Sequence, residues 1–167
     1  MSKMVPIAIT ILHCRGRYLF LQRRNPPYEN LWSMVGGKVG LGEHIRGAAI
    51  REVMEETGAS EINNYEYRGL VSERLIEADG TLSAHFLIFV NYAEIQSFNE
   101  DHREGRLSLF TEEEIESAKD LFLPSDYRMF ECFRDNCQIR TIYEAELLHD
   151  DDGYHLIYYR ESSDEAR

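Results

Sequence analysis

The sequence has little cysteine, and its cysteines form no pattern. Only three occur among 167 residues, at Cys14, Cys132 and Cys137. They make no CxxC pair and no zinc-type cluster with histidine, and an odd number argues against a framework of disulfides. This usage is typical of a reducing compartment, and it predicts a cytoplasmic protein.

The chain also lacks a long hydrophobic run. The longest early apolar stretch, residues 5–12, is far shorter than the ~20 residues of a membrane-spanning helix, and it contains Pro6. No small-residue cleavage site follows it, so the stretch predicts a first strand and not a signal peptide. We therefore expect no membrane partner.

Basic residues are scarce relative to acidic ones. Lys and Arg number 18 against 30 Asp and Glu, which gives a formal net charge of -12. Such a surface favours solubility and offers no electrostatic footprint for a DNA or RNA polymer. An anionic small molecule would still require a local cation.

Repeats, low-complexity blocks and linkers are missing from the sequence as well. A chain of 167 residues with 43% hydrophobic and 29% charged residues is typical of one ordinary globular domain. We expect this domain over residues 1–160 and a disordered tail over residues 161–167.

Strand and helix patterns follow one another without a regular strand–helix–strand rhythm, which predicts the α+β class. Strands are expected over residues 5–13, 18–24 and 31–37 (the last running into a glycine turn), 62–76, 81–95, 138–149 and 154–160. Helices are expected over residues 44–57, from Thr111 with a capping box to Glu114, and after Pro124 with Ser125 or Asp126 as the cap.

Two common phosphate-binding loops do not occur in this chain. No stretch supplies GxxxxGK[ST]. The GxGxxG fingerprint would need a glycine where Ile45 stands after Gly40 and Gly42. Any binding of phosphate must therefore rely on another arrangement.

The helix predicted over residues 44–57 carries acids on one face. Glu52, Glu55 and Glu56 recur at i, i+3 and i+4, opposite an apolar stripe. That stripe consists of Ile50, Val53, Met54 and Thr57. Three such glutamates alone are most often a solvated face. In a cleft, their repulsion would be removed by a hard cation such as Mg²⁺, which prefers oxygen ligands.

A fixed spacing of glycines and charges surrounds these acids. Gly37 is followed after five residues by Glu43 and after seven more by Arg51; the run then reads Glu52, Glu55, Glu56 and Gly58. The sequence thereby resembles the Nudix box, GX5EX7REUXEEXGU, where U is a bulky aliphatic residue and Ala59 is smaller than usual. The resemblance implies a Nudix fold, an α/β/α sandwich around a mixed β-sheet. It also implies hydrolysis of a nucleoside diphosphate linked to a further moiety.

The resemblance implies a role for each residue of the box. The implied ligands of Mg²⁺, for which Mn²⁺ can substitute, are Glu52, Glu55, Glu56 and the carbonyl of Gly36. Arg51 would orient the glutamates and pair with Glu43. Gly37 and Lys38 would meet the substrate phosphates, with an exposed loop lysine as the alternative.

Many Nudix relatives carry one more glutamate in a later loop, shortly before a bulky aromatic residue. Glu104 precedes Phe110 in this way and is implied to be a metal ligand or the general base. Glu100 is the competing candidate, and a solvated loop acid is the alternative to both.

Outside the box, the chain is most similar to MutT-type and oxidised-purine nucleoside triphosphate diphosphatases. This likeness implies cleavage of a nucleoside triphosphate, such as 8-oxo-dGTP, to monophosphate and pyrophosphate. The residues that it places at the substrate are Arg23, Trp32, Ser33 and Asp126. The alternatives are a surface charge for Arg23, a core position for Trp32 and helix capping for Asp126. Ser33 stands where an amide is expected, which puts strict 8-oxoguanine selectivity in doubt.

Rival functions stay open. One is hydrolysis of ADP-ribose or a nucleotide sugar, although ADP-ribose enzymes tend to carry a proline soon after the box and Pro124 is the only later proline here. Another is a nucleotide sensor without catalysis, although such proteins often lose box carboxylates that this chain retains. The family commonly forms monomers or homodimers, and the sequence does not choose between them.

Overall fold

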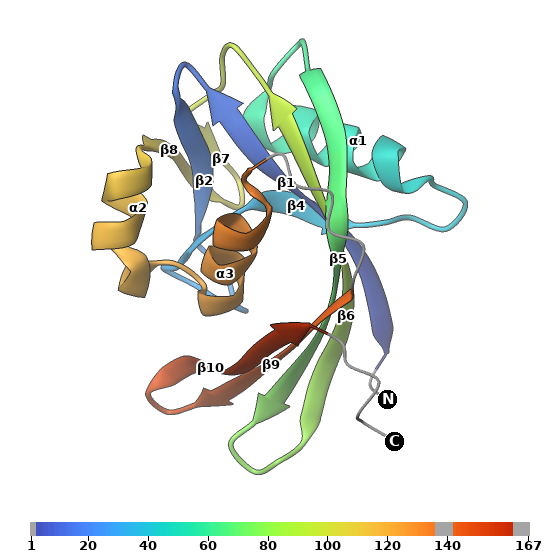
Figure 1. Cartoon of the computed structure of the whole chain (residues 1–167), viewed down its shortest axis with the longest axis vertical. Helices are drawn as coiled ribbons and strands as arrows, with labels where there is room; N and C mark the ends of the chain where they lie inside the picture. The colour runs from blue at the N-terminus through green and yellow to red at the C-terminus, as the bar shows by residue number, and fades with distance from the viewer. Residues whose placement is uncertain (1–2, 136–141, 162–167) are drawn as a thin grey trace.

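The computed structural model describes residues 3–135 and 142–161, and its centre is one mixed β-sheet of ten strands (Figure 1). The strand order is β10-β9-β5-β6-β1-β2-β8-β7, with β3 paired to β2 and β4 paired to β1. β1 runs parallel to β6 and β5 runs parallel to β9, while the other pairs are antiparallel. The strands are β1 (Met4–Cys14), β2 (Arg17–Arg23), β3 (Trp32–Ser33), β4 (Val35–Lys38), β5 (Asn63–Glu77), β6 (Leu82–Glu94), β7 (Asp101–His102), β8 (Gly105–Phe110), β9 (Ile142–Asp150) and β10 (Gly153–Glu161).

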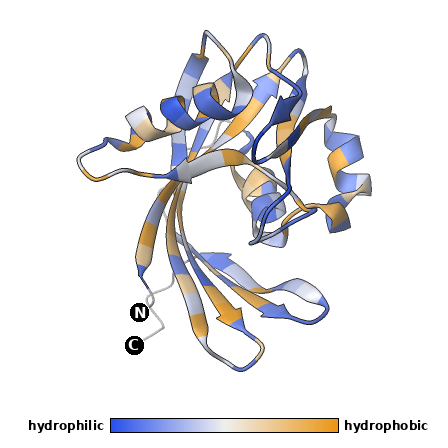
Figure 2. Cartoon of the chain, turned by 180° about the vertical axis from the view of Figure 1, so that it is seen from behind, coloured by the Kyte–Doolittle hydropathy of each residue, from blue (hydrophilic) through white to orange (hydrophobic). Residues whose placement is uncertain are grey.

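Helices cover both faces of the sheet (Figures 1 and 2). α1 (Ile45–Thr57) packs on β1 and β4. α2 (Glu112–Ser117) and α3 (Pro124–Phe133) lie on the opposite side, joined by a 3-10 turn over Lys119–Leu121. The predicted α+β class and the layered sandwich are confirmed.

β1 occupies the middle of the sheet because its residues are apolar on both faces. All of residues 8–12 are buried, a pattern typical of a strand that is covered on both sides. On one side, Ala8 meets the two alanines of α1. On the other side, Ile9 and Ile11 join an aromatic core that includes Phe20 and Phe130.

α1 has the predicted ends but not the predicted buried face. It begins after His44 and ends at Gly58, whose φ of 72° is the left-handed conformation that glycine favours. Val53 and Thr57 are buried as expected and Ile50 is half-buried, but Met54 is 45% exposed. The residues that face the sheet are Ala48, Ala49, Val53, Glu56 and Thr57. The small alanines allow the helix to approach β1 and β4 closely. Because the alanine side of the helix faces the sheet, Glu56 on the same side points inward.

The strand predicted over residues 31–37 is present as β3 and β4, and the chain turns after it at Gly42, whose φ is 81°. Gly36 and Gly37 belong to β4 and pair with Ile9 and Ala8 of β1. A side chain at Gly36 would collide with the backbone of β1, and a Cβ at Gly37 would lie 2.5 Å from the carboxyl group of Glu52. The glycines therefore serve close approach, and the backbone here remains extended.

Several local predictions at the turns are confirmed. Gly80 has a φ of 86° in the β5–β6 hairpin, and Thr111 and Glu114 form the capping box of α2. Glu161, which was predicted to lie in the tail, pairs with Tyr143 and ends β10. Residues 162–167 of that tail, Cys137 and the first part of the predicted strand at 138–149 lie outside the described residues. Among the described helices, none has the length and apolar character needed to span a membrane.

Candidate active site

Arg51 on α1 connects three acids and a strand carbonyl. Its Nε and Nη2 donate to the two oxygens of Glu43 at 2.7 and 2.9 Å. Its Nη1 donates to Glu52 at 2.6 Å and to Glu55 at 3.2 Å. Nη2 also donates to the carbonyl of Lys38 at 3.1 Å, which ties α1 to β4. The predicted pairing of Arg51 with Glu43 is present, and Arg51 is placed to orient the helix acids.

Glu43 is held ionised by these contacts. The Arg51 guanidinium and then the N–H of Gly40, which donates at 2.8 Å, lower the pKa of Glu43 to about 2. Glu43 therefore stays a fixed anion over the whole neutral range, and its partner Arg51 stays anchored with it.

Glu56 is the buried acid of the box, with only 4% of its surface exposed. Its Oε2 accepts a hydrogen bond from the N–H of Gly36 at 3.2 Å. Burial, then a hydrogen bond and repulsion from Glu104, then repulsion from Glu52, raise the pKa of Glu56 to about 9. Without a cation beside it, Glu56 therefore favours its protonated form at neutral pH.

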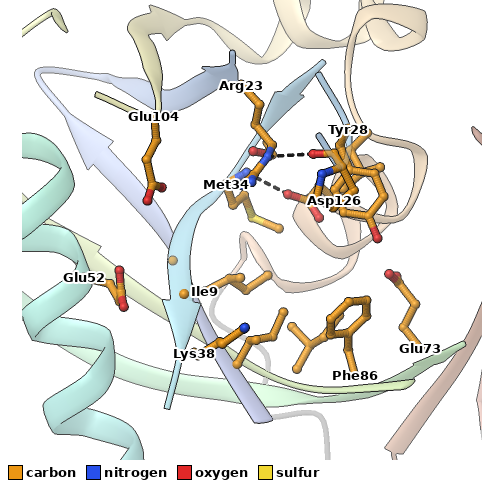
Figure 3. Close-up of a pocket in the computed structure, with 17 residues that line it drawn as sticks. Ile9, Arg23, Tyr28, Met34, Lys38, Glu52, Glu73, Phe86, Glu104 and Asp126 are labelled. Atoms are coloured by element: carbon orange, nitrogen blue, oxygen red, sulfur yellow. Dashed lines mark hydrogen bonds between the residues drawn. The ribbon is translucent and has the colours of Figure 1, made fainter. Parts of the chain in front are cut away.

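Glu104 reaches the box from a distant part of the chain. It lies in the turn between β7 and β8, and its side chain lines the same cavity as Glu52 (Figure 3). Glu100 lines a separate depression on the surface with Phe98 and Arg106. Of the two candidate loop acids, the structure thus brings Glu104 and not Glu100 to the helix carboxylates.

One cavity of about 450 Å³ extends from these acids across the sheet (Figure 3). Its volume falls in the range of small-molecule sites. Glu52 and Glu104 lie at one end, together with residues 36–38 of β4. Its apolar floor is formed by Ile7 and Ile9 of β1 and by Phe86 and Ile88 of β6. The opposite end is polar and contains Arg23, Tyr28, Glu73 and Asp126.

Asp126 points into this cavity and does not cap α3. The cap position is Leu123, which makes no side-chain cap, and Pro124 is the first helical residue. The Asp126 carboxylate instead accepts the N–H of Met34 at 2.7 Å, and 6% of the residue is exposed. Burial raises the pKa of Asp126 to about 7, against the opposing effects of the Met34 N–H and the charge of Arg23. Both predicted cap candidates, Ser125 and Asp126, are therefore wrong as caps.

The remaining predicted substrate residues divide into two groups. Arg23, Ser33, Gly37 and Lys38 all line the cavity. Trp32 does not: it is 6% exposed, belongs to the aromatic core and meets Phe110 edge to face at 4.9 Å. Trp32 therefore takes the core position that was the alternative to substrate binding. Successive side chains of β3 point to opposite faces, so Ser33 faces the cavity and the indole of Trp32 points away from it.

Two polar residues of the cavity were not predicted from the sequence, Glu73 and Tyr28. Glu73 is 2% exposed although it lies in the middle of β5. A signal for it exists: Val71, Glu73 and Leu75 alternate on one face of the strand, and the two apolar neighbours mark that face as internal. An acid in such a position indicates either a buried partner or a ligand.

The donor set at the box fits a hard divalent cation. Over residues 3–135 and 142–161, no three acidic, histidine or cysteine side chains are already gathered as a metal cluster, and Arg51 forms ion pairs with Glu52 and Glu55. Repulsion from Glu104 and Glu52 raises the pKa of Glu56, so a positive charge among these three carboxyl groups would be stabilised. Oxygen ligands of this kind suit Mg²⁺ or Mn²⁺.

Comparison with known proteins gives a consistent family match. A family model described as NUDIX domain matches residues 3–134. The chain is also similar to an RNA pyrophosphohydrolase from Campylobacter jejuni subsp. jejuni serotype O:2, with 24% identity over 133 residues, which are 74% of this chain and 78% of the relative.

Solved structures share the fold. The mutator MutT protein from Bacillus halodurans superposes with a TM-score of 0.72 at 23% identity, covering 95% of this chain and 97% of that one. A bifunctional NMN adenylyltransferase/ADP ribose pyrophosphatase from Francisella tularensis, complexed with AMP and a Mn ion, gives 0.62 at 16% identity, over 78% of this chain and 41% of that one.

Proposed function

Because the chain belongs to the Nudix hydrolase family, we propose that it is a Mg²⁺-dependent pyrophosphohydrolase that cleaves a nucleoside triphosphate to a nucleoside monophosphate and pyrophosphate. One observation carries this proposal. A single cavity joins the acids of the box to an apolar floor that ends in buried polar groups. Such a cavity suits a molecule with a phosphate chain at one end and a flat heterocycle at the other.

The residues of the chain divide the work between them. Glu52, Glu55, Glu56, Glu104 and the carbonyl of Gly36 would hold the metal, which when bound neutralises the phosphates and lowers the pKa of a water. Glu104, at the edge of the cavity, is our candidate to remove the proton of the attacking water.

Neighbouring residues position these groups and bind the substrate. Arg51, anchored by Glu43, holds Glu52 in place, and Lys38 is proposed to bind a phosphate oxygen as a point charge. Gly37 leaves room for the Glu52 carboxylate beside β4.

The far end of the cavity would receive the base. Asp126 is proposed to hydrogen-bond its edge, and Arg23 and Ser33 lie close enough to line the same space. Since the Ser33 hydroxyl already approaches the carbonyl of Leu21 at 3.4 Å, it cannot replace both groups of an amide. An oxidised purine nucleotide such as 8-oxo-dGTP is therefore a candidate substrate, without strict selectivity for it.

A second candidate is the 5′-triphosphate end of an RNA. The similarity to the Campylobacter jejuni RNA pyrophosphohydrolase favours it, and the net charge of -12 opposes it. Cleavage of ADP-ribose is the third possibility, with the Francisella tularensis structure as its support. Action in the cytoplasm and a monomeric or dimeric state remain predictions from the sequence.

A substrate panel tests the proposal. Wild type, Glu52→Gln and the surface control Glu113→Gln would be incubated with Mg²⁺ or Mn²⁺ and each dNTP, 8-oxo-dGTP, ADP-ribose, a nucleotide sugar and a 5′-triphosphorylated RNA oligonucleotide. Pyrophosphate and phosphate would be measured separately. We expect pyrophosphate from the triphosphates, lost in Glu52→Gln and kept in the control. Turnover of ADP-ribose, the sugar or RNA alone would refute the substrate class, and tight binding without turnover would indicate a sensor.

A further inference from the structure

The polar end of the cavity contains buried groups that have no hydrogen-bond partner within the protein. Glu73 Oε2, the Tyr28 hydroxyl and the Ser125 hydroxyl are all buried, and each lacks a partner among the described residues. Glu73 and Ser125 are 2% and 0% exposed. Figure 3 shows the Glu73 carboxyl group and the Tyr28 hydroxyl pointing toward one another at the inner end of the cavity.

Burial without a partner is costly unless a ligand completes the site. An unsatisfied buried carboxyl group destabilises a fold, and replacement by an apolar side chain usually relieves the cost. Burial, and more weakly repulsion from Asp126, raise the pKa of Glu73 to about 8 against the opposing effect of Ser125, and no cation contributes. Among the described residues, its Oε2 atom therefore has neither a counter-charge nor a hydrogen-bond partner. A buried acid such as Glu73 is expected at the wall of a cavity when a bound molecule supplies the hydrogen-bond donor that the protein does not.

The neighbours of Glu73 restrict the chemistry of that donor. Two carboxyl groups, Glu73 and Asp126, make this end rich in acceptor oxygens, and Arg23 at the same end already donates to the carbonyl of Pro27 at 3.0 Å. A ligand edge that offers N–H groups matches these oxygens. The apolar floor of the cavity extends over two residues along β1, which is about 7 Å, and across the neighbouring strands β1 and β6, which are about 4.8 Å apart. These dimensions approximate the footprint of a fused bicyclic ring.

We propose that Glu73 is a specificity-determining residue that accepts a hydrogen bond from the exocyclic amino group of a purine bound in this cavity. The inference rests on the proposed function for the identity of the substrate as a nucleotide. It extends that function by selecting aminopurines over purines that lack the amino group. Asp126 contacts the same edge, while Tyr28 and Ser125 border the Glu73 carboxyl group.

The test compares GMP, AMP and IMP as ligands, because GMP and IMP differ only by the 2-amino group. Equilibrium binding would be measured by calorimetry for wild type, for Glu73→Met and for the control Glu77→Gln, which alters an acid of the same strand outside the cavity. Wild type should bind GMP or AMP roughly ten- to a hundredfold more tightly than IMP. Glu73→Met should lose this preference, and Glu77→Gln should keep it.

Thermal denaturation separates recognition from a structural role. If the acid is kept for a ligand, Glu73→Met should melt at least about 2 °C higher than wild type while it loses the preference. Should the methionine variant not fold, Glu73→Leu carries the same test. The proposal would be overturned if the affinity of the preferred aminopurine relative to IMP were equal in wild type and variant, if wild type preferred neither GMP nor AMP over IMP, or if wild type bound none of the three. Loss of the preference in a protein that hydrolyses no triphosphate would uphold Glu73 and refute the proposed function alone.

Discussion

Replacement of Gly37 by alanine should reduce activity about a hundredfold through a single methyl group. The added Cβ would lie 2.5 Å from the carboxyl carbon of Glu52, whereas ordinary contacts begin at 3.4 Å. The carboxylate must therefore retreat by roughly 1 Å, and a displacement of that size at a reacting centre can reduce the rate about a hundredfold. Alanine fits the extended backbone of β4, so the strand itself can remain.

Stability should change little in this variant. The Arg51–Glu52 pair is partly exposed, so its disturbance costs ~0.2–1 kcal/mol. The gain from replacing a strand glycine is of similar size, ~0.5–1 kcal/mol. The melting temperature should thus stay within about 4 °C of wild type. Steady-state hydrolysis of the best triphosphate and a thermal melt measure both quantities.

Gly47→Ala is the matched control, because it adds the same methyl group within α1. A Cβ at Gly47 would meet the Cγ of Glu43 at 3.9 Å, an ordinary contact. Its activity should equal that of wild type, and the helix should gain ~0.5–1 kcal/mol. Wild-type turnover by Gly37→Ala, or an equal loss in Gly47→Ala, would refute the reasoning about close approach.

Two further predictions concern charged groups. Asp126 has a pKa of about 7 in the folded state, above its ordinary value near 3.9, so the folded state binds a proton that the unfolded state has lost. The stabilisation from this proton is complete below pH ~4. It is lost as the pH rises toward 7, at up to ~1.4 kcal/mol per pH unit. Asp126→Asn should remove this slope from the difference between the two denaturation profiles, and an unchanged slope would contradict the burial argument. Arg51→Lys should lower kcat at least about tenfold and change the free energy of unfolding by less than ~1 kcal/mol. The reason is that lysine cannot form two hydrogen bonds to Glu43 and also reach Glu52. A wild-type kcat in this variant would show that orientation by Arg51 is dispensable.

The sequence predicts those features that depend on neighbours close along the chain. Arg51 and Glu55 stand at i and i+4 on α1, so the 3.6-residue period is enough to place them together. The pairing of Arg51 with Glu43, which precedes the helix, was implied by the family resemblance. The capping box of α2 and the turn at Gly80 are equally local. Glu104 was chosen by resemblance, and its approach to Glu56 depends on the pairing of β8 with β2.

The features that were missed depend on the order of strands. Glu73 reaches the cavity because β5 lies beyond β6 from β1, and no local pattern contains that arrangement. The burial of Glu56 depends on how closely two alanines allow α1 to approach the sheet. Trp32 and Ser33 point to opposite sides of β3, so only a three-dimensional arrangement decides which of them faces the cavity.

The short segment from Ser33 to Lys38 touches both ends of the cavity. Met34 holds Asp126 by its N–H, and two residues later Gly36 holds Glu56 in the same way. In evolutionary terms, the two halves of the substrate site differ in freedom. Under the proposed function, substitutions on β5 and α3 should alter the preferred base while the acids of α1 keep their role. Changes in residues 33–38 disturb both at once, so this segment should tolerate the fewest substitutions.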